Sequence, residues 1–138
     1  MGTNLPPNNF KVIEREYAGE IIEIRDGVSG QPNQAGAVRK TVIFSDFTKL
    51  FCYEDIKGGK IDYYHYDYYD ANGMIIMKFH SEAHPNLPEF QTETEPFHMH
   101  VKKDAQDLAA SVRLPIPNEY FKELIHIIDF ILTSKYLR

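Results

Sequence analysis

Histidines gather in one short stretch of this sequence. Four of the six lie between residues 80 and 100, at His80, His84, His98 and His100. An unperturbed imidazole titrates near neutral pH, so it can act as a general acid or a general base. Neutral imidazole is also a preferred ligand of zinc and other first-row metals. The cluster is therefore compatible with acid–base catalysis, with a divalent metal site, or with histidines that are only hydrogen-bonded within the fold. Its spacing matches no established metal motif.

A second concentration of functional groups is the tyrosine-rich run YYHYDYY over residues 63–69. Side chains alternate between the two faces of a strand. One face then carries Tyr63, His65, Asp67 and Tyr69. The other face carries Tyr64, Tyr66 and Tyr68. On the mixed face, Asp67 is placed to orient His65, and Tyr63 and Asp67 are candidate ligand-binding residues. Tyrosines on both faces are also typical of a central strand that only packs.

Lysines lie close to both ends of the histidine stretch. Lys78 precedes His80 on the same predicted strand, and Lys102 and Lys103 follow His100 after Val101. They predict a local positive patch for a phosphate-bearing ligand, or a solvated charged face. The chain as a whole has a net charge of −5, from 15 basic and 20 acidic residues. A general DNA binder would normally be basic, so that class is disfavoured.

Length and composition indicate one globular domain spanning residues 1–138. No apolar run approaches the roughly 20 residues of a membrane helix. The polar, proline-rich residues 1–9 predict a flexible lead-in without a signal sequence. The single cysteine, Cys52, excludes an internal disulfide and is typical of a reducing compartment. We therefore expect a cytoplasmic protein with no membrane partner.

Hydrophobic alternation predicts an antiparallel meander of about five or six strands. Strands are expected over residues 22–26, 37–45, 48–56, 60–70, 74–80 and 97–103. For residues 10–19 we favour a strand over a short helix. Gly58, Gly59 and the Asn72-Gly73 pair supply the positive φ that tight hairpins need. The glycine-rich residues 27–36 predict a mobile loop.

The clearest helix is predicted over residues 118–137 at the C-terminus. Asn118 is a suitable N-cap after Pro117. One apolar stripe follows at helical spacing, formed by Phe121, Leu124, Ile125, Ile128, Ile131 and Leu132. This amphipathic helix should pack its stripe on one face of the sheet, which gives an α+β domain.

The region from residue 38 to the C-terminal helix resembles the TumE-type toxin family of prokaryotic toxin–antitoxin modules, long treated as a domain of unknown function. That family combines a tyrosine-rich strand, an Asp-containing turn, a histidine loop, a histidine strand and a C-terminal helix. The matching residues are His65, residues 70–73, Lys78-Phe79, Ala83-His84-Pro85 and residues 95–101. The chain departs from the pattern at Ala83, where the family doubles its histidine, and at Met99, where the family has a basic residue. It is therefore similar to a diverged member.

This resemblance implies the toxin half of a type II module, neutralised by an antitoxin protein, with a target in RNA. On that hypothesis the catalytic residues are His65, His84, His98 and His100. Lys78, Lys102 and Arg113 would hold a phosphate, beside Tyr63 and Asp67.

Two other functions stay open. One is a metal-binding protein that holds a divalent ion such as zinc through His80, His84, His98 and His100. The other is a non-catalytic interaction module, whose exposed sheet face meets an antitoxin or a second copy of the chain as a homodimer.

Overall fold

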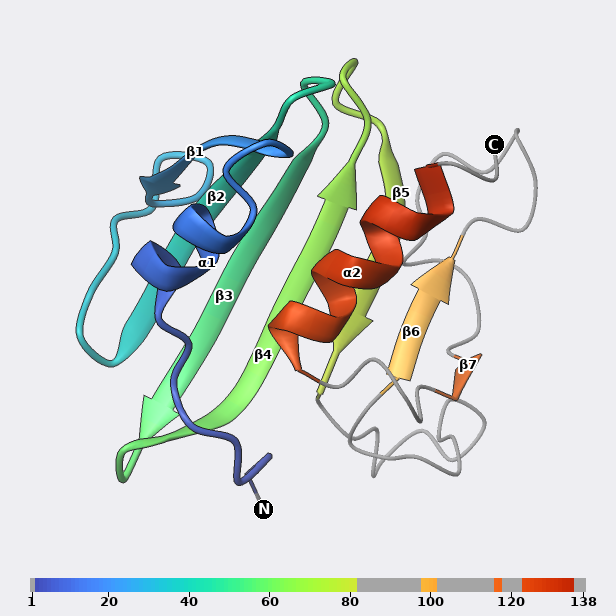
Figure 1. The fold of residues 1–138 in the computed structure, drawn as a ribbon. Helices are drawn as coiled ribbons and strands as arrows, with labels where there is room; N and C mark the ends of the chain where they lie inside the picture. The colour runs from blue at the N-terminus through green and yellow to red at the C-terminus, as the bar shows by residue number, and fades with distance from the viewer. Residues whose placement is uncertain (1, 82–97, 102–115, 118–122, 136–138) are drawn as a thin grey trace.

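The computed structural model describes residues 2–81, 98–101, 116–117 and 123–135. Within these ranges, the strands form one antiparallel sheet in which every strand pairs with its neighbours in sequence (Figure 1). The strands are β1 (Ile21–Asp26), β2 (Ala37–Phe44), β3 (Lys49–Lys57), β4 (Lys60–Tyr69), β5 (Ile75–His80), β6 (His98–Val101) and β7 (Ile116–Pro117). The meander and the α+β class predicted from the sequence are confirmed. Within the described residues the sheet has seven strands, because the two-residue β7 extends it beyond the six predicted segments.

Two tight turns define the centre of the sheet. Gly58 and Gly59 connect β3 to β4 with φ values of 59° and 74°. Between β4 and β5, Asp70 Oδ1 accepts hydrogen bonds from the backbone N–H groups of Asn72 and Met74. Both hairpins were expected from the sequence, since glycine and Asx side chains satisfy these backbone conformations.

One face of the sheet carries the hydrophobic core. Alternate residues of β3 and β4 are buried on it, among them Leu50, Cys52, Tyr64, Tyr66 and Tyr68. Their sequence neighbours on the same strands are half-buried or, at Lys49, exposed. The predicted division of the tyrosines between two faces is therefore confirmed.

Helix α1 (Phe10–Glu16) corrects the prediction of a strand over residues 10–19. Asn9 caps the helix, because its side-chain oxygen accepts a hydrogen bond from the Val12 N–H at 3.2 Å. The helix buries Phe10 and Ile13, which are one helical turn apart and contact the core. The cap and this spacing are helical signals, and they decide the local structure over the strand propensity of the flanking residues.

Helix α2 (Leu124–Lys135) confirms the predicted C-terminal helix and begins at Leu124. Residues 118–122, including the expected cap Asn118, lie outside the described residues. Its buried stripe consists of Leu124, Ile127, Ile128 and Ile131. Ile125, which the sequence placed in the stripe, is 40% exposed. No described helix is long and apolar enough to cross a membrane.

Both helices lie on the same side of the sheet, α1 over its first strands and α2 over β4 and β5 (Figure 1). We call the opposite side the open face. It carries the alternate residues of β2 to β5 that point away from the helices, among them Arg39, Tyr53, His65 and His80.

The packing of α2 gives a first prediction. Replacing Ile128 by Ala removes a fully buried side chain, so the free energy of unfolding should fall by about 2–5 kcal/mol. Ile125→Ala removes the same atoms from the exposed side of the helix and should lower it by about 1 kcal/mol or less. Urea denaturation of both variants measures the difference. Equal losses would show that α2 does not pack through the Ile128 face.

Candidate functional site

Cross-strand pairing arranges the open face in rows. Antiparallel partners that face each other share a side of the sheet. One row crosses from β2 to β5 and reaches β6 by backbone pairing: Arg39, Tyr53, His65, His80 and position 98. The neighbouring row runs in the same way: Thr41, Phe51, Asp67, Lys78 and position 100. The open face therefore collects the mixed side chains of β4 and the polar residues of β5.

The centre of the open face is a histidine pair with a carboxylate. The rings of His65 and His80 are 4.3 Å apart between centroids and tilted by 31°. The Nε2 atom of His80 lies 3.3 Å from Asp67 Oδ1. The sequence suggested that Asp67 orients His65, but this carboxylate contacts His80, which comes from the adjacent strand. We call His65, His80 and Asp67 the histidine pair site.

Burial decides the charge of His80, whose side chain is only 13% exposed. Loss of water lowers the pKa of His80, and the nearby His65 and Lys78 lower it further. The hydrogen bond and charge of Asp67 oppose this and raise the pKa. The net shift is downward, so His80 is held as neutral imidazole at neutral pH.

Aromatic rings surround the histidine pair site. Tyr63 and Tyr53 approach the His65 ring edge-on, with centroids 6.0 and 6.3 Å away. The guanidinium of Arg39 lies 4.9 Å from the centre of the Tyr53 ring. On the next row, Phe51 and Tyr69 pack with centroids 4.8 Å apart. The site is thus framed by π faces, which suit planar ligands.

The structure brings five of the predicted site residues together: Tyr63, His65, Asp67, Lys78 and His80. His98 and His100 are placed through their backbone, opposite His80 and Lys78. His84, Lys102 and Arg113 lie outside the described residues. Their roles stay predictions.

A metal site is not found within the described part of the chain. There, no group of three or more His, Cys, Asp or Glu side chains is arranged to hold an ion. The metal hypothesis also needs His84, which is outside these residues, and the side chains of His98 and His100. The histidine pair site offers two imidazoles and one carboxylate on adjacent strands, but they contact one another.

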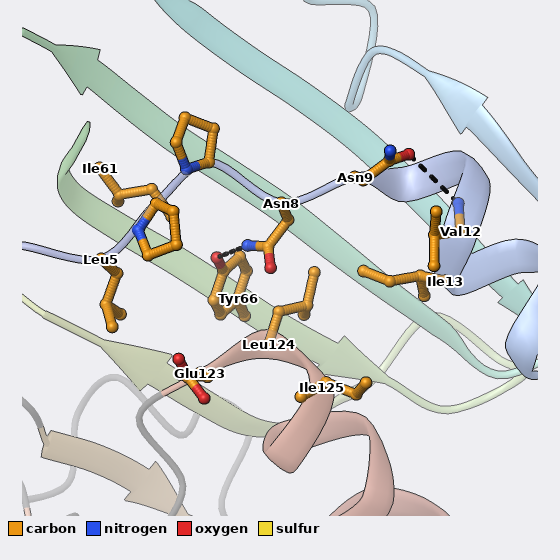
Figure 2. Close-up of a pocket in the computed structure, with 12 residues that line it drawn as sticks. Leu5, Asn8, Asn9, Val12, Ile13, Ile61, Tyr66, Glu123, Leu124 and Ile125 are labelled. Carbon is orange, nitrogen blue, oxygen red and sulfur yellow. Dashed lines mark hydrogen bonds between the residues drawn. The ribbon is translucent and has the colours of Figure 1, made fainter. Parts of the chain in front are cut away.

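Sequence reasoning missed a polar cluster on the helix side of the sheet. A pocket of about 230 Å³ lies between residues 5–9, the start of α1 and the start of α2 (Figure 2). In it the Asn8 amide donates a hydrogen bond to the Tyr66 oxygen at 3.2 Å (Figure 2). The Tyr66 hydroxyl in turn donates to Glu54 Oε2 at 2.6 Å. Asn8 also donates to the same carboxylate oxygen.

Glu54 is the unusual member of this cluster. It is 1% exposed, and its Oε1 atom has no hydrogen-bond partner among the described residues. Burial raises the pKa of Glu54, although its hydrogen bonds from Tyr66 and Asn8 act in the opposite direction. The signal was available in the sequence, since alternation places Glu54 on the same face as Leu50 and Cys52. An acidic residue in a buried register is a candidate functional or structural switch.

Removing the carboxylate of Asp67 tests the electrostatics of the histidine pair site. Asp67→Asn should lower the pKa of His80, because the charge and the hydrogen bond that favour imidazolium are weakened. NMR titration of the His80 ring from about pH 4 to about pH 8 measures it. Asp62→Asn, which removes a carboxylate beside Lys57 at the far end of β4, is the control. An unchanged or higher pKa in Asp67→Asn would contradict the geometry.

Glu54 predicts a dependence of stability on pH. Its folded-state pKa lies above the unfolded value near 4.5, so folding favours the protonated carboxyl. That stabilisation is present below about pH 4.5 and is lost as the pH rises through the folded pKa. As the pH rises through the folded pKa of Glu54, the free energy of unfolding of the native protein should therefore fall relative to that of Glu54→Gln. Urea denaturation at a series of pH values measures this difference. For the control Glu20→Gln, which changes an exposed residue, unfolding free energy should depend on pH as it does for the native protein. If Glu54→Gln showed the same pH dependence as the native protein, the raised pKa of Glu54 would be refuted.

The sequence matches a known protein family over most of its length. A family model described as Toxin TumE matches residues 9–134. The matched range includes α1, all seven strands and α2 up to its penultimate residue. No curated protein and no solved structure gave a match. Because the match covers most of the chain and confirms the resemblance seen in the sequence, the protein belongs to the TumE toxin family, the toxin components of toxin–antitoxin modules.

Proposed function

We propose that this toxin belongs to a type II module and acts on RNA through the open face of the sheet. The observation that carries the proposal is the histidine pair site, in which His65 and His80 lie 4.3 Å apart, ring to ring, with Asp67 on His80. Two imidazoles side by side can supply both the general base and the general acid that RNA cleavage uses. The partner implied by the family is an antitoxin protein.

The chemistry uses the 2′-hydroxyl of the RNA itself. Neutral His80 accepts the proton of the 2′-hydroxyl while the 2′-oxygen forms a bond to the adjacent phosphorus. The P–O5′ bond breaks, and protonated His65 gives its proton to the leaving 5′-oxygen. The products are a 2′,3′-cyclic phosphate and a 5′-hydroxyl. Burial and the neighbouring His65 lower the pKa of His80, so His80 is the neutral member that accepts a proton.

The surroundings supply binding for bases and phosphate. Single-stranded RNA is held by stacking of its bases on aromatic side chains and by cations along its backbone. Tyr53, Tyr63 and Phe51 offer half-buried rings on the open face. Lys78 is half-buried beside His80 and makes no ion pair with a described residue, so its charge is available to a phosphate.

Growth of a bacterial host under tight induction tests the toxin assignment. The native chain should arrest growth, whereas His65→Gln and His80→Gln, at matched folded yield, should not. Loss of a general acid or base lowers a rate by about 10²- to 10⁴-fold, which should abolish arrest. His126→Gln is the control, since this histidine is 53% exposed on α2, away from the open face. Arrest that persists in both site variants would overturn the histidine mechanism, and no arrest by the native chain would overturn the toxin action.

Cleavage in vitro tests the RNA step directly. The purified native protein should convert a single-stranded RNA into products with a cyclic phosphate, detected by mass spectrometry. The same oligonucleotide with deoxyribose at the cleaved position should stay intact, because the attacking hydroxyl is missing. Cleavage of the deoxy substrate would exclude the proposed mechanism.

A further inference from the structure

A second cavity lies on the open face of the sheet, the face that also carries the histidine pair site, but at a distance from that site. It has a volume of about 460 Å³ and lies between β1, β2, β3 and the loop over residues 27–32. Phe51, Thr41 and Ile43 contribute from the sheet, with Lys49 and Arg25 beside them. Small-ligand sites in proteins are typically about 300–1,000 Å³, so the cavity is large enough for a nucleotide. We call it the loop pocket.

The wall of the loop pocket is built by hydrogen bonds. The Gly27 N–H donates to the Arg39 carbonyl, and the Thr41 hydroxyl donates to the Gly27 carbonyl, both at 2.8 Å. Val28 and Gln31 exchange two backbone hydrogen bonds around a tight turn. Gly27 has a φ of +92°, and a Cβ there would approach the Gln31 carbonyl oxygen at 2.8 Å. Only glycine suits this position, so the wall depends on it.

The chemistry of the loop pocket matches a nucleotide of RNA. Phe51 lies between the pocket and Tyr69 of β4, so its ring is a stacking surface at the pocket edge. Lys49 is exposed and has no ion pair with a described residue, which leaves its charge available to a phosphate. Arg25 lies across the pocket and is bridged to the exposed Glu23 at 2.8 Å.

The loop pocket is connected to the histidine pair site through one row of the sheet. Phe51 pairs with Asp67, and Asp67 contacts His80. Phe51 and His80 are thus two strands apart, a separation of about 10 Å at the usual strand spacing. A single strand of RNA crossing the open face would reach both.

We propose that the loop pocket is a subsite for one nucleotide of single-stranded RNA, next to the phosphodiester held at His65 and His80. This proposal rests on the proposed function. The base stacks on Phe51 and the phosphate contacts Lys49. A base inside a duplex is already stacked and paired, so the subsite selects single strands.

Binding of fluorescein-labelled, 2′-O-methylated single-stranded oligonucleotides of about six nucleotides tests the subsite by fluorescence anisotropy. Phe51→Leu keeps an apolar side chain and removes the stacking ring, so Kd should rise by about 5- to 150-fold. Lys49→Gln should weaken binding and reduce the slope of log K against log salt by about 1. Gly27→Ala distorts the wall and should weaken binding without altering the sheet. Phe47→Leu, which changes a ring that is 65% exposed outside the pocket, is the control.

The outcomes separate the subsite from the function. If the native protein binds and cleaves RNA but Phe51→Leu and Lys49→Gln bind as tightly as Phe47→Leu, the subsite is wrong and the proposed function stands. If the native protein binds no RNA, both are overturned. Duplex RNA that binds as tightly as the single strand, with the same dependence on Phe51, would overturn the selection of single strands.

Discussion

The register between β3 and β4 is the constraint on which the rest of the molecule depends. The Gly58-Gly59 turn brings Lys57 opposite Lys60, and from the Asp55–Tyr63 pair to the Lys49–Tyr69 pair the ladder advances without interruption. A slip of one residue would exchange the two faces of β4. Tyr64, Tyr66 and Tyr68 would then leave the core, and His65 and Asp67 would enter it. Burying a histidine and a carboxylate without partners is costly, so the hydrophobic core and the open face fix the same register.

A core with three fully buried tyrosines needs partners for its hydroxyl groups. The Tyr68 hydroxyl donates to Thr48 Oγ1 at 2.9 Å, and Tyr66 is bonded to Glu54. The Glu54 carboxylate also holds Asn8, which ties the N-terminal segment to the sheet. Buried polar networks are stable when their members are satisfied, and the exception in this one is Glu54 Oε1, which has no hydrogen-bond partner in the described part of the chain. The raised pKa of Glu54 follows from that position, since protonation removes the charge that the core solvates poorly.

Features that depend on short-range sequence patterns, such as the faces of a strand and the positions of tight turns, were predicted correctly from the sequence. Alternation along residues 63–69 assigned each side chain of β4 to the correct face, and the glycine and Asx turns located both central hairpins. The contact of Asp67 with His80 was beyond such reasoning, because it depends on which residue of β5 lies opposite Asp67. The loop pocket has the same origin, since Gly27 meets Thr41 only after β1 and β2 have paired. The prediction of a strand at residues 10–16 was wrong for a different reason. In the sequence, the Asn9 cap and the Phe10–Ile13 spacing are weak signals next to the β-branched residues of that segment.

The proposed action on RNA requires this acidic chain to separate its charges in space. On the helix side, burial raises the pKa of the Tyr17 hydroxyl, and the nearby Asp129, Glu16 and Glu20 raise it further. On the open face, Lys78 lies opposite Asp67 in the sheet, and neither Lys49 nor Lys78 forms an ion pair with a described residue. At physiological ionic strength the screening length is about 8 Å, comparable to the thickness of a packed layer of about 10 Å. The electric field at the open face is therefore set mainly by the residues of that face, Asp67 included, rather than by the net charge of −5.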